Sequence, residues 1–215
     1  MARNKYPEET VEKILTAAGR LFLEKGYEQT TIQDIVDNLD GLTKGAVYHH
    51  FKSKAEIMDA LCDRMFHEDN PIEKVRERKD LNGLEKMKEV VRLTQEPERV
   101  SLGRQSMGIL KNPYMLAKSI EDNRRFVVPL WRELIEEGIA DGSIRTEYPQ
   151  EVAELLSLLN TLWISPVVFP ATREGVLRKF RCSMEIFAHL GVPVIDEEMI
   201  ALADKFFQMA PPELM

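Results

Sequence analysis

Helical periodicity is the feature that most constrains the fold of this 215-residue chain. Apolar residues return at intervals of three and four positions along most of it, and no convincing stretch alternates strictly between apolar and polar residues. Intervals of three and four place side chains on one face of an α-helix, whereas a half-buried strand requires alternation. The sequence therefore predicts an all-α protein, and its length is sufficient for a substantial buried core.

A longer helix followed by a short one is predicted near the N-terminus. The first helix should run from about Pro7 to just before Gly26, where the chain turns back. Thr31 and Asp34 are spaced as in a capping box, so a second helix should begin after Thr31. We expect it to end before Gly41, because glycine tolerates the left-handed backbone of a tight turn.

A third helix is predicted from Thr43, which caps it, to near His50. Ser53 and Glu56 form another potential capping box, so a fourth helix should follow over about residues 54–68. We expect this fourth helix to connect the N-terminal three-helix domain to the rest of the chain.

The chain beyond the connector is predicted to form a helical body over residues 55–215, distinct from an N-terminal domain of residues 1–54. Pro129 lies inside one long helical pattern and should kink or restart that helix, because proline lacks the N–H that an α-helix requires. The expected helices of the body are Leu81–Gln95, Glu98–Leu110, Asn112–Gly138, Gln150–Phe169, Thr172–Leu190 and Asp196–Met209.

Charge is distributed unevenly between these two parts. The chain carries a net charge of −7. Residues 1–54 hold eight basic and eight acidic side chains, so the whole excess of acid lies in the body. A neutral N-terminal domain disfavours non-specific binding to a polyanion, which depends on many basic side chains.

Cysteine usage and hydropathy indicate a cytoplasmic protein. Cys62 and Cys182 lack the sequence neighbours of a disulfide framework or a zinc site. The start of the chain has no apolar run of the kind that a secretion signal needs. Leu155–Thr172 is uncharged and close to the roughly 18 residues of a membrane span, but polar residues and prolines interrupt it. We therefore expect no metal, no cofactor and no membrane segment.

Two short helices joined by a glycine turn, with another helix packed behind them, form the helix-turn-helix arrangement, which presents its second short helix to the DNA major groove. The residues themselves make this interpretation more specific: Leu21-Phe22, Gly26-Tyr27, Thr30-Thr31, Ile35 and the run Thr43–Lys54, which reads TKGAVYHHFKSK. Over Val11 to about Leu61 the chain resembles the DNA-binding domain of the TetR family of bacterial repressors. It departs from that family's usual Ala-Gly-Val-Ser turn, because residues 39–43 (Leu-Asp-Gly-Leu-Thr) make the turn one residue longer. This leaves open the angle of the third helix on DNA.

Side-chain chemistry suggests roles along the third helix. Lys44 lies in the first turn, where a cationic donor can reach a guanine edge or a phosphate. Gly45 and Ala46 are small, so the backbone can approach the groove, and the Ala46 methyl can meet a thymine methyl. Val47 and Phe51 should point into the core.

The resemblance implies further contacts with the phosphate backbone. It assigns them to Tyr48, His49 and Lys54, and to Thr30 or Thr31 in the second helix. Two other interpretations of the aromatic segment stay open. The segment could form a core-facing turn, or its adjacent histidines could belong to a metal site, although adjacent side chains diverge on a helix.

Two late helices carry broad apolar faces that could pair two copies of the chain. A single recognition helix reads few base pairs, so such proteins bind inverted half-sites as two-fold dimers. The resemblance implies a four-helix interface between copies, and burial within one chain is the alternative. The candidate interface residues are Leu155, Leu159, Leu162, Trp163, Leu177, Phe180, Met184 and Phe187.

Flexible and aromatic side chains between the N-terminal domain and this interface could line a pocket for a small, mainly apolar ligand, and ordinary core packing is the alternative. Ligand binding would change the angle of the fourth helix, alter the spacing of the two DNA readers and release DNA. The candidate pocket residues are Phe66, Met87, Met107, Met115, Phe126 and Trp131.

We therefore expect a sequence-specific transcriptional repressor, not an enzyme, that binds an inverted-repeat operator in double-stranded DNA as a homodimer. The first alternative is an all-helical enzyme, which is disfavoured because the sequence has no phosphate-binding loop, nucleophile elbow or HExxH motif. The second is a helical adaptor that binds proteins through its late apolar helices and uses the N-terminal domain only for packing.

Overall fold

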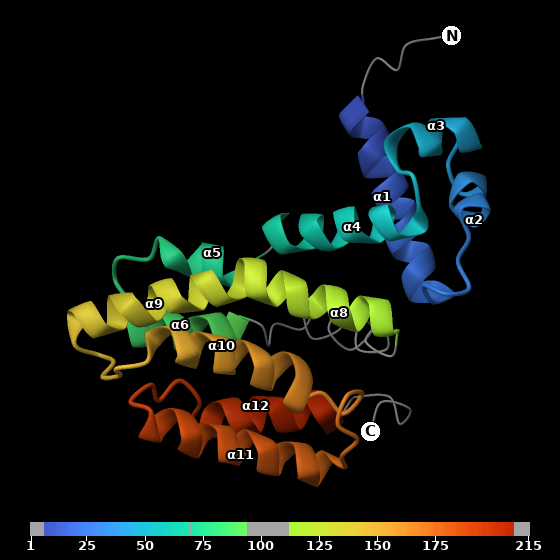
Figure 1. The fold of residues 1–215 in the computed structure, drawn as a ribbon. Coiled ribbons are helices and arrows are strands. Elements are labelled where there is room, and N and C mark those ends of the chain that lie inside the picture. Colours follow the sequence, from blue (N-terminus) through green and yellow to red (C-terminus); the bar gives the residue numbers. More distant parts are fainter. Residues whose placement is uncertain (1–6, 69, 94–111, 209–215) are drawn as a thin grey trace. The chain divides into compact units, whose positions relative to one another are not determined.

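The structure is a computed structural model that describes residues 7–68, 70–93 and 112–208, and the side chains of all of these except Pro7 and residues 65–68. The described residues form helices and the turns between them, and none belongs to a strand (Figure 1). The prediction of an all-α fold is confirmed. The chain divides into two compact units, unit 1 (residues 1–70) and unit 2 (residues 71–215).

Unit 1 contains four helices over its described residues: α1 (Pro7–Glu24), α2 (Ile32–Asp37), α3 (Lys44–His50) and α4 (Lys54–Glu68). α1 packs against α2 and α4, and α2 packs against α3. Their inner faces share a core that includes Ile14, Ala18, Phe22, Ile35, Val47 and Ile57. The helix expected to act as a connector, α4, thus packs as part of unit 1.

Hydrogen bonds at the helix ends account for the sharp boundaries in unit 1. Thr31 Oγ1 accepts a bond from the Asp34 N–H at 3.0 Å, and Asp34 Oδ2 accepts one from the Thr31 N–H at 2.8 Å, which completes the predicted capping box. Ser53 Oγ accepts from the Glu56 N–H at 3.1 Å. The Glu56 carboxylate instead accepts from the Lys52 N–H at 2.7 Å, so only half of the second predicted box forms.

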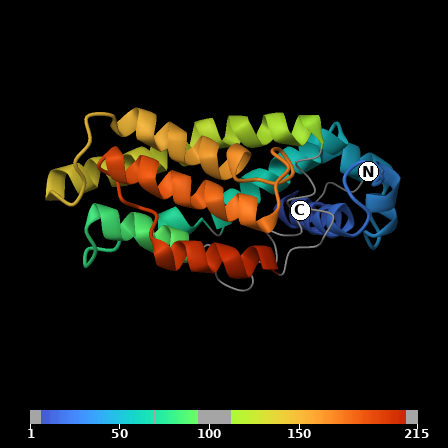
Figure 2. The ribbon, with the colours of Figure 1, turned by 90° about the horizontal axis from the view of Figure 1, so that it is seen from below.

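Unit 2 is a helical bundle with one main apolar core and a smaller apolar cluster around Ile164, Val176 and Phe207. In the views of Figures 1 and 2, α10, α11 and α12 run alongside one another. The core cluster includes Val75, Met87, Leu134, Val152, Phe187 and Ile200. The described elements are α5 (Pro71–Arg76), α6 (Gly83–Leu93), α8 (Pro113–Asp122), η2 (Asn123–Val127), α9 (Val128–Asp141), α10 (Pro149–Leu158), η3 (Leu159–Trp163), α11 (Arg173–His189) and α12 (Glu197–Gln208). None of the helices described is long and apolar enough to cross a membrane.

A π-helical turn, η2, accommodates Pro129 within the long helical segment α8–η2–α9. The Val128 N–H donates to the Asn123 carbonyl, one residue further back than in an α-helix, immediately before the proline. This wider turn falls where the proline ring would otherwise meet the preceding helical turn. Asn123 Oδ1 also accepts a bond from the buried Ser157 hydroxyl of α10 at 2.6 Å. The predicted interruption at Pro129 is therefore a local change of helix type.

A close crossing of α6 and α9 depends on two glycines. A Cβ atom built on Gly83 would lie 2.2 Å from the backbone nitrogen of Gly138, so no larger residue fits without moving a helix. Beside this crossing the Lys86 ammonium is buried and donates to Glu137 Oε1 at 2.6 Å and to the Arg76 carbonyl at 2.9 Å. Neither feature was predicted from the sequence.

The predicted and observed helices of unit 2 differ most at two places. The helical backbone predicted over Gln150–Phe169 ends at Trp163, shortly before Ser165-Pro166. The short helix α5 was not predicted. The predicted helix Glu98–Leu110 lies outside the described residues.

Candidate functional site

α3 is a short helix fixed at both ends and anchored by its inner face. Thr43 Oγ1 accepts a hydrogen bond from the Ala46 N–H at 3.2 Å, which caps the start of the helix. At the other end the Phe51 N–H donates to the Val47 carbonyl at 2.9 Å. Val47 is completely buried and Phe51 is 8% exposed, so both point inward as predicted. The helix is therefore held to unit 1 by apolar packing.

The outer face of α3 combines small, cationic and aromatic side chains. Lys44, Gly45, Tyr48 and His49 are exposed, together with the capping Thr43, whereas Ala46 is half-buried. The interpretation of the whole segment as a core-facing turn is therefore wrong for Tyr48 and His49. Among the described residues, no group of three or more His, Cys, Asp or Glu side chains could hold a metal ion.

Gly45 is not required by the packing of unit 1. A Cβ atom at this position would meet only Thr43 Oγ1, at 3.8 Å, which is an ordinary van der Waals distance. Alanine would also favour the helix more than glycine does. The small size of residue 45 therefore leaves room outside the fold and serves no internal contact.

The two threonines at the start of α2 have different surroundings. Thr30 is completely buried, and its hydroxyl lies within hydrogen-bonding distance of the Gly26 carbonyl, at 2.9 Å, and of the Leu21 carbonyl, at 3.2 Å. The predicted phosphate contact by Thr30 is wrong, because this hydroxyl fastens the α1–α2 turn. Thr31 is exposed and caps α2, so it is the threonine that a ligand can reach.

Lys54 makes contacts inside unit 1 that the sequence did not predict. Its ammonium donates to the Tyr27 carbonyl at 2.6 Å and to the Glu28 carbonyl at 3.3 Å. It also lies 4.3 Å from the centre of the Tyr27 ring, within the range of a cation–π interaction. Lys54 thus ties the first residue of α4 to the α1–α2 turn.

An ion pair fixes the start of α2 to the end of α1. Lys25 Nζ donates to Asp34 Oδ1 at 2.7 Å. The hydrogen bond from Lys25, with those from the Thr31 hydroxyl and N–H, holds the pKa of the Asp34 carboxyl well below its usual range. Burial, with the nearby charges of Glu28 and Asp59, raises the pKa of the Tyr27 phenol. These contacts make the α1–α2 turn a rigid support for α2.

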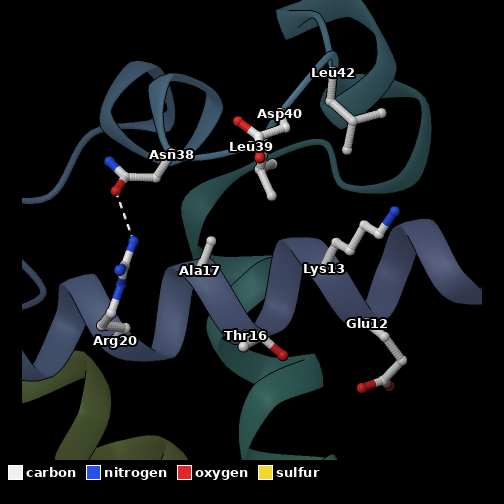
Figure 3. A pocket seen from close by; sticks show the side chains of 9 residues that line it. All are labelled: Glu12, Lys13, Thr16, Ala17, Arg20, Asn38, Leu39, Asp40 and Leu42. Atoms are coloured by element: carbon white, nitrogen blue, oxygen red, sulfur yellow. Dashed lines mark hydrogen bonds between the residues drawn. The ribbon is translucent and has the colours of Figure 1, made fainter.

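A groove of about 510 Å³ lies between α1 and the turn that follows α2 (Figure 3). Arg20 Nη2 donates across it to Asn38 Oδ1 at 2.7 Å. Gly41 has a φ of 74°, so it supplies the left-handed residue of the longer turn, and the side chain of Leu42 extends towards α1. The additional turn residue therefore leaves the Thr43 cap intact. None of the residues predicted to contact DNA lines this groove.

The candidate pocket residues of unit 2 lie mostly in its core. Met87 and Trp131 belong to the central apolar cluster, and Met115 is 5% exposed. Phe126, on the π-helical turn η2, is half-buried. Met107 and the side chain of Phe66 lie outside what the structure describes.

Most of the candidate dimer residues are half-buried on α10, η3 and α11. Phe187 is the exception: it is 1% exposed and belongs to the core of unit 2. Its predicted place in a dimer interface is wrong, because its own chain already covers it. Leu158 and Phe169, which were not among the candidates, are 47% and 49% exposed. The half-buried candidates are Leu155, Leu159, Leu162, Trp163, Leu177, Phe180 and Met184.

Comparison with known proteins finds similar bacterial transcriptional regulators both for unit 1 and for the whole fold. The family model of the bacterial regulatory proteins of the tetR family matches residues 14–61. The HTH-type transcriptional regulator TtgR of Pseudomonas putida is 38% identical over 73 residues, which span 34% of each chain. The HTH-type transcriptional repressor KstR2 of Rhodococcus jostii is 29% identical over 71% of this chain and 76% of its own. A TetR-family regulator from Pectobacterium atrosepticum, 20% identical, shares the fold with a TM-score of 0.62 over 88% of this chain and 98% of the other.

The capped α3, with its buried anchor and its exposed cationic face, makes unit 1 a helix-turn-helix domain of a DNA-binding transcriptional regulator. Residues 14–61 thus carry the DNA-binding domain of the TetR family of bacterial regulatory proteins. Because this domain belongs to regulatory proteins, the match supports the expectation that the chain is not an enzyme.

Proposed function

We propose that this chain is a cytoplasmic repressor that binds an inverted-repeat operator as a homodimer and is released from it by a small, mainly apolar molecule. The observation that carries the proposal is the division of α3 into a buried anchor, Val47, and an exposed face that is small and cationic. A helix of this kind can enter the major groove, because its anchor fixes its position while the opposite side stays free.

The exposed residues divide by chemistry into base-reading and phosphate-binding groups. Lys44 can donate to a guanine edge or to a phosphate. Gly45 and Ala46 allow close approach of the backbone. Tyr48 and His49 of α3, and the capping residues Thr43 and Thr31, are exposed and carry groups that can donate hydrogen bonds to the flanking phosphates.

The proposed homodimer is supported by apolar surface on α10, η3 and the turn that follows. Leu158 and Phe169 are large apolar side chains that are about half exposed in the single chain. Exposed apolar side chains near other half-buried ones mark a surface that a partner can cover. A second copy is the partner that an inverted-repeat operator requires.

The proposed ligand would bind in unit 2. Met115, an adaptable side chain on α8, is buried, and the aromatic Phe126, within the π-helical turn η2, is half-buried. π-helical turns are frequent at functional sites. In the sequence α4 ends at Glu68 and α5 begins at Pro71, so a change in unit 2 could reach unit 1 along the chain through α4.

Selection from random duplex DNA, followed by gel shift of the selected sequence, tests the DNA-binding part. We expect enrichment of one inverted repeat, and weaker binding of that sequence by Lys44→Ala. The matched control is Lys79→Ala, which removes an exposed lysine from unit 2 and should bind as the wild type does. Absence of any enriched sequence would favour the adaptor. For the ligand, a compound library is titrated against the bound operator, and failure of every compound to release DNA would count against the sensing role.

A further inference from the structure

The outward face of α11 carries charges of both signs along a single stripe. Apart from the adjacent residues Arg181 and Cys182 at its centre, its members are spaced by three or four residues, so they lie on one side of the helix. The opposite side of α11, with Val176, Ser183 and Phe187, is buried in unit 2. Figure 2 looks onto α11, which lies between α10 and α12 in that view. The exposed stripe consists of Glu174, Arg178, Arg181, Cys182, Glu185 and His189.

When the stripe is laid antiparallel on a copy of itself, its outer positions pair basic residues with acidic ones. Arg178 and Glu185 lie equally far on either side of the point between Arg181 and Cys182, and Glu174 and His189 are centred on the same point. An isologous contact brings residue i against residue j of the copy, and j against i. Two copies of α11 packed antiparallel about that point would therefore place each Arg178 opposite the partner's Glu185. Each Glu174 would face the partner's His189.

Other arrangements of two such helices lack this match. Parallel packing in register would set Arg178 against the partner's Arg178 and Glu185 against the partner's Glu185, which is repulsive. Within one chain, Arg178 donates to Glu174 at 3.1 Å, but the two side chains are 67% and 81% exposed. An exposed pair of this kind is weak, so Arg178 can exchange it for a partner across an interface.

At the centre of the stripe, the proposed packing would set Arg181 opposite the partner's Cys182, which is uncharged when protonated, and not opposite the partner's Arg181. Hydrogen bonds from Arg173 lower the pKa of the Asp204 carboxyl of α12, and the charge of Arg181 lowers it further. Arg181 therefore has an opposite charge nearby in its own chain. Half-buried Leu177 and Ile186 flank the stripe and can add apolar contact.

We infer that α11 pairs antiparallel with its copy about the point between Arg181 and Cys182, and that the Arg178–Glu185 contacts set the register of the homodimer. The inference rests on the proposed homodimer and adds to it the contacting face and the alignment.

Exchanging the charges at positions 178 and 185 tests the proposed alignment of the two copies of α11. Sedimentation of purified full-length chains gives the dimer dissociation constant, and circular dichroism checks that each variant is folded. Arg178→Glu or Glu185→Arg alone should raise this constant about tenfold, because each places like charges opposite one another twice per dimer. Arg178→Glu combined with Glu185→Arg should restore it to within about threefold of the wild type. The matched control, Arg178→Glu with Glu174→Arg, rebuilds only the pair within one chain and should stay weak. Rescue by Glu174→Arg and not by Glu185→Arg would overturn the inference.

Cross-linking tests the same centre independently of charge. In a Cys62→Ser chain, Cys182 is the sole cysteine. Because Cys182 lies next to the proposed axis, a short bis-maleimide should join two chains, and Cys182→Ser should abolish the product. A wild-type chain that sediments as a monomer at every concentration would overturn the proposed homodimer itself. A stable dimer that neither responds to Arg178→Glu nor cross-links through Cys182 would overturn only the register.

Discussion

α3 and α11 are built alike but present opposite kinds of surface. Each is held by a buried apolar side, through Val47 in one case and through Val176 and Phe187 in the other. α3 contains no carboxylate, and its exposed Lys44 stands beside small residues, which suits a polyanion. The exposed stripe of α11 carries bases, Arg178 and Arg181, between two acids, Glu174 and Glu185, which suits a copy of itself. The buried side fixes where each helix lies, whereas the charge order of the exposed side specifies its partner.

The largest effect is expected from charge reversal on α3. Lys44→Glu should weaken operator binding by about 3 kcal/mol, roughly a hundredfold, because it removes a cationic donor and adds repulsion from phosphate. The dimer dissociation constant should not change. Fluorescence anisotropy with labelled operator measures the first quantity, and sedimentation measures the second. If Lys44→Glu weakened operator binding and dimerisation equally, α3 and α11 would not act on separate partners.

A smaller loss of binding should follow from adding one methyl group to α3. Gly45→Ala should stabilise unit 1 by about 1 kcal/mol, because alanine favours a helix and the new Cβ meets no obstacle. Operator affinity should nevertheless fall about tenfold, since the backbone could no longer approach the groove as closely. Thermal unfolding measures the expected gain in stability, and fluorescence anisotropy measures the expected loss of operator affinity. Unchanged affinity would show that the backbone at residue 45 stays away from DNA.

The Lys54→Met variant distinguishes a structural role of Lys54 within unit 1 from a contact with a DNA phosphate. Lys54→Met should destabilise unit 1 by about 1 kcal/mol through loss of the bonds to the Tyr27 and Glu28 carbonyls, and should weaken operator binding severalfold. The dependence of the logarithm of affinity on the logarithm of salt concentration should keep its slope. A decrease of the slope by about 0.9 would instead identify Lys54 as a phosphate contact.

The smallest expected effect concerns acid stability of the α1–α2 turn. The pKa of Asp34 is depressed in the folded state, so its bonds to Lys25 and Thr31 contribute stability above the usual carboxyl value of 3.8. That contribution is lost as the pH falls below this value towards the folded pKa. Unfolding by urea across this range should show a steeper loss of stability for the wild type than for Asp34→Asn. If the stability of the two proteins fell equally with pH, the depressed pKa of Asp34 would not be the cause of the acid sensitivity.

Local chemistry explains why unit 1 could be predicted closely. The bounds of α2 and α3 follow from threonine caps and from glycine turns, and these depend on residues within four positions of one another. The inward direction of Val47 and Phe51 follows from helical spacing in the same way. The sequence therefore indicated the exposed face of α3 without knowledge of its neighbours.

Features that depend on distant residues were not accessible from the sequence. The burial of Thr30 and the contacts of Lys54 require the α1–α2 turn to be in place. The glycine crossing of α6 and α9 arises from packing between helices far apart in the chain, and the bond from Ser157 to Asn123 likewise joins α10 to η2. Phe187 fits the pattern of an interface residue equally well, and only the bundle of unit 2 shows that its own chain buries it. Helical spacing gives the face of a side chain but not which chain covers it.

A double-mutant cycle between Lys44 and the operator tests the central claim most directly. Each base pair of the selected half-site is replaced in turn, and the affinity of the wild type and of Lys44→Ala is measured for every sequence. The account predicts at least one position at which replacement costs about 1–3 kcal/mol for the wild type and almost nothing for Lys44→Ala. Equal costs for the two proteins at every position would contradict the claim that the exposed face of α3 reads DNA sequence through Lys44.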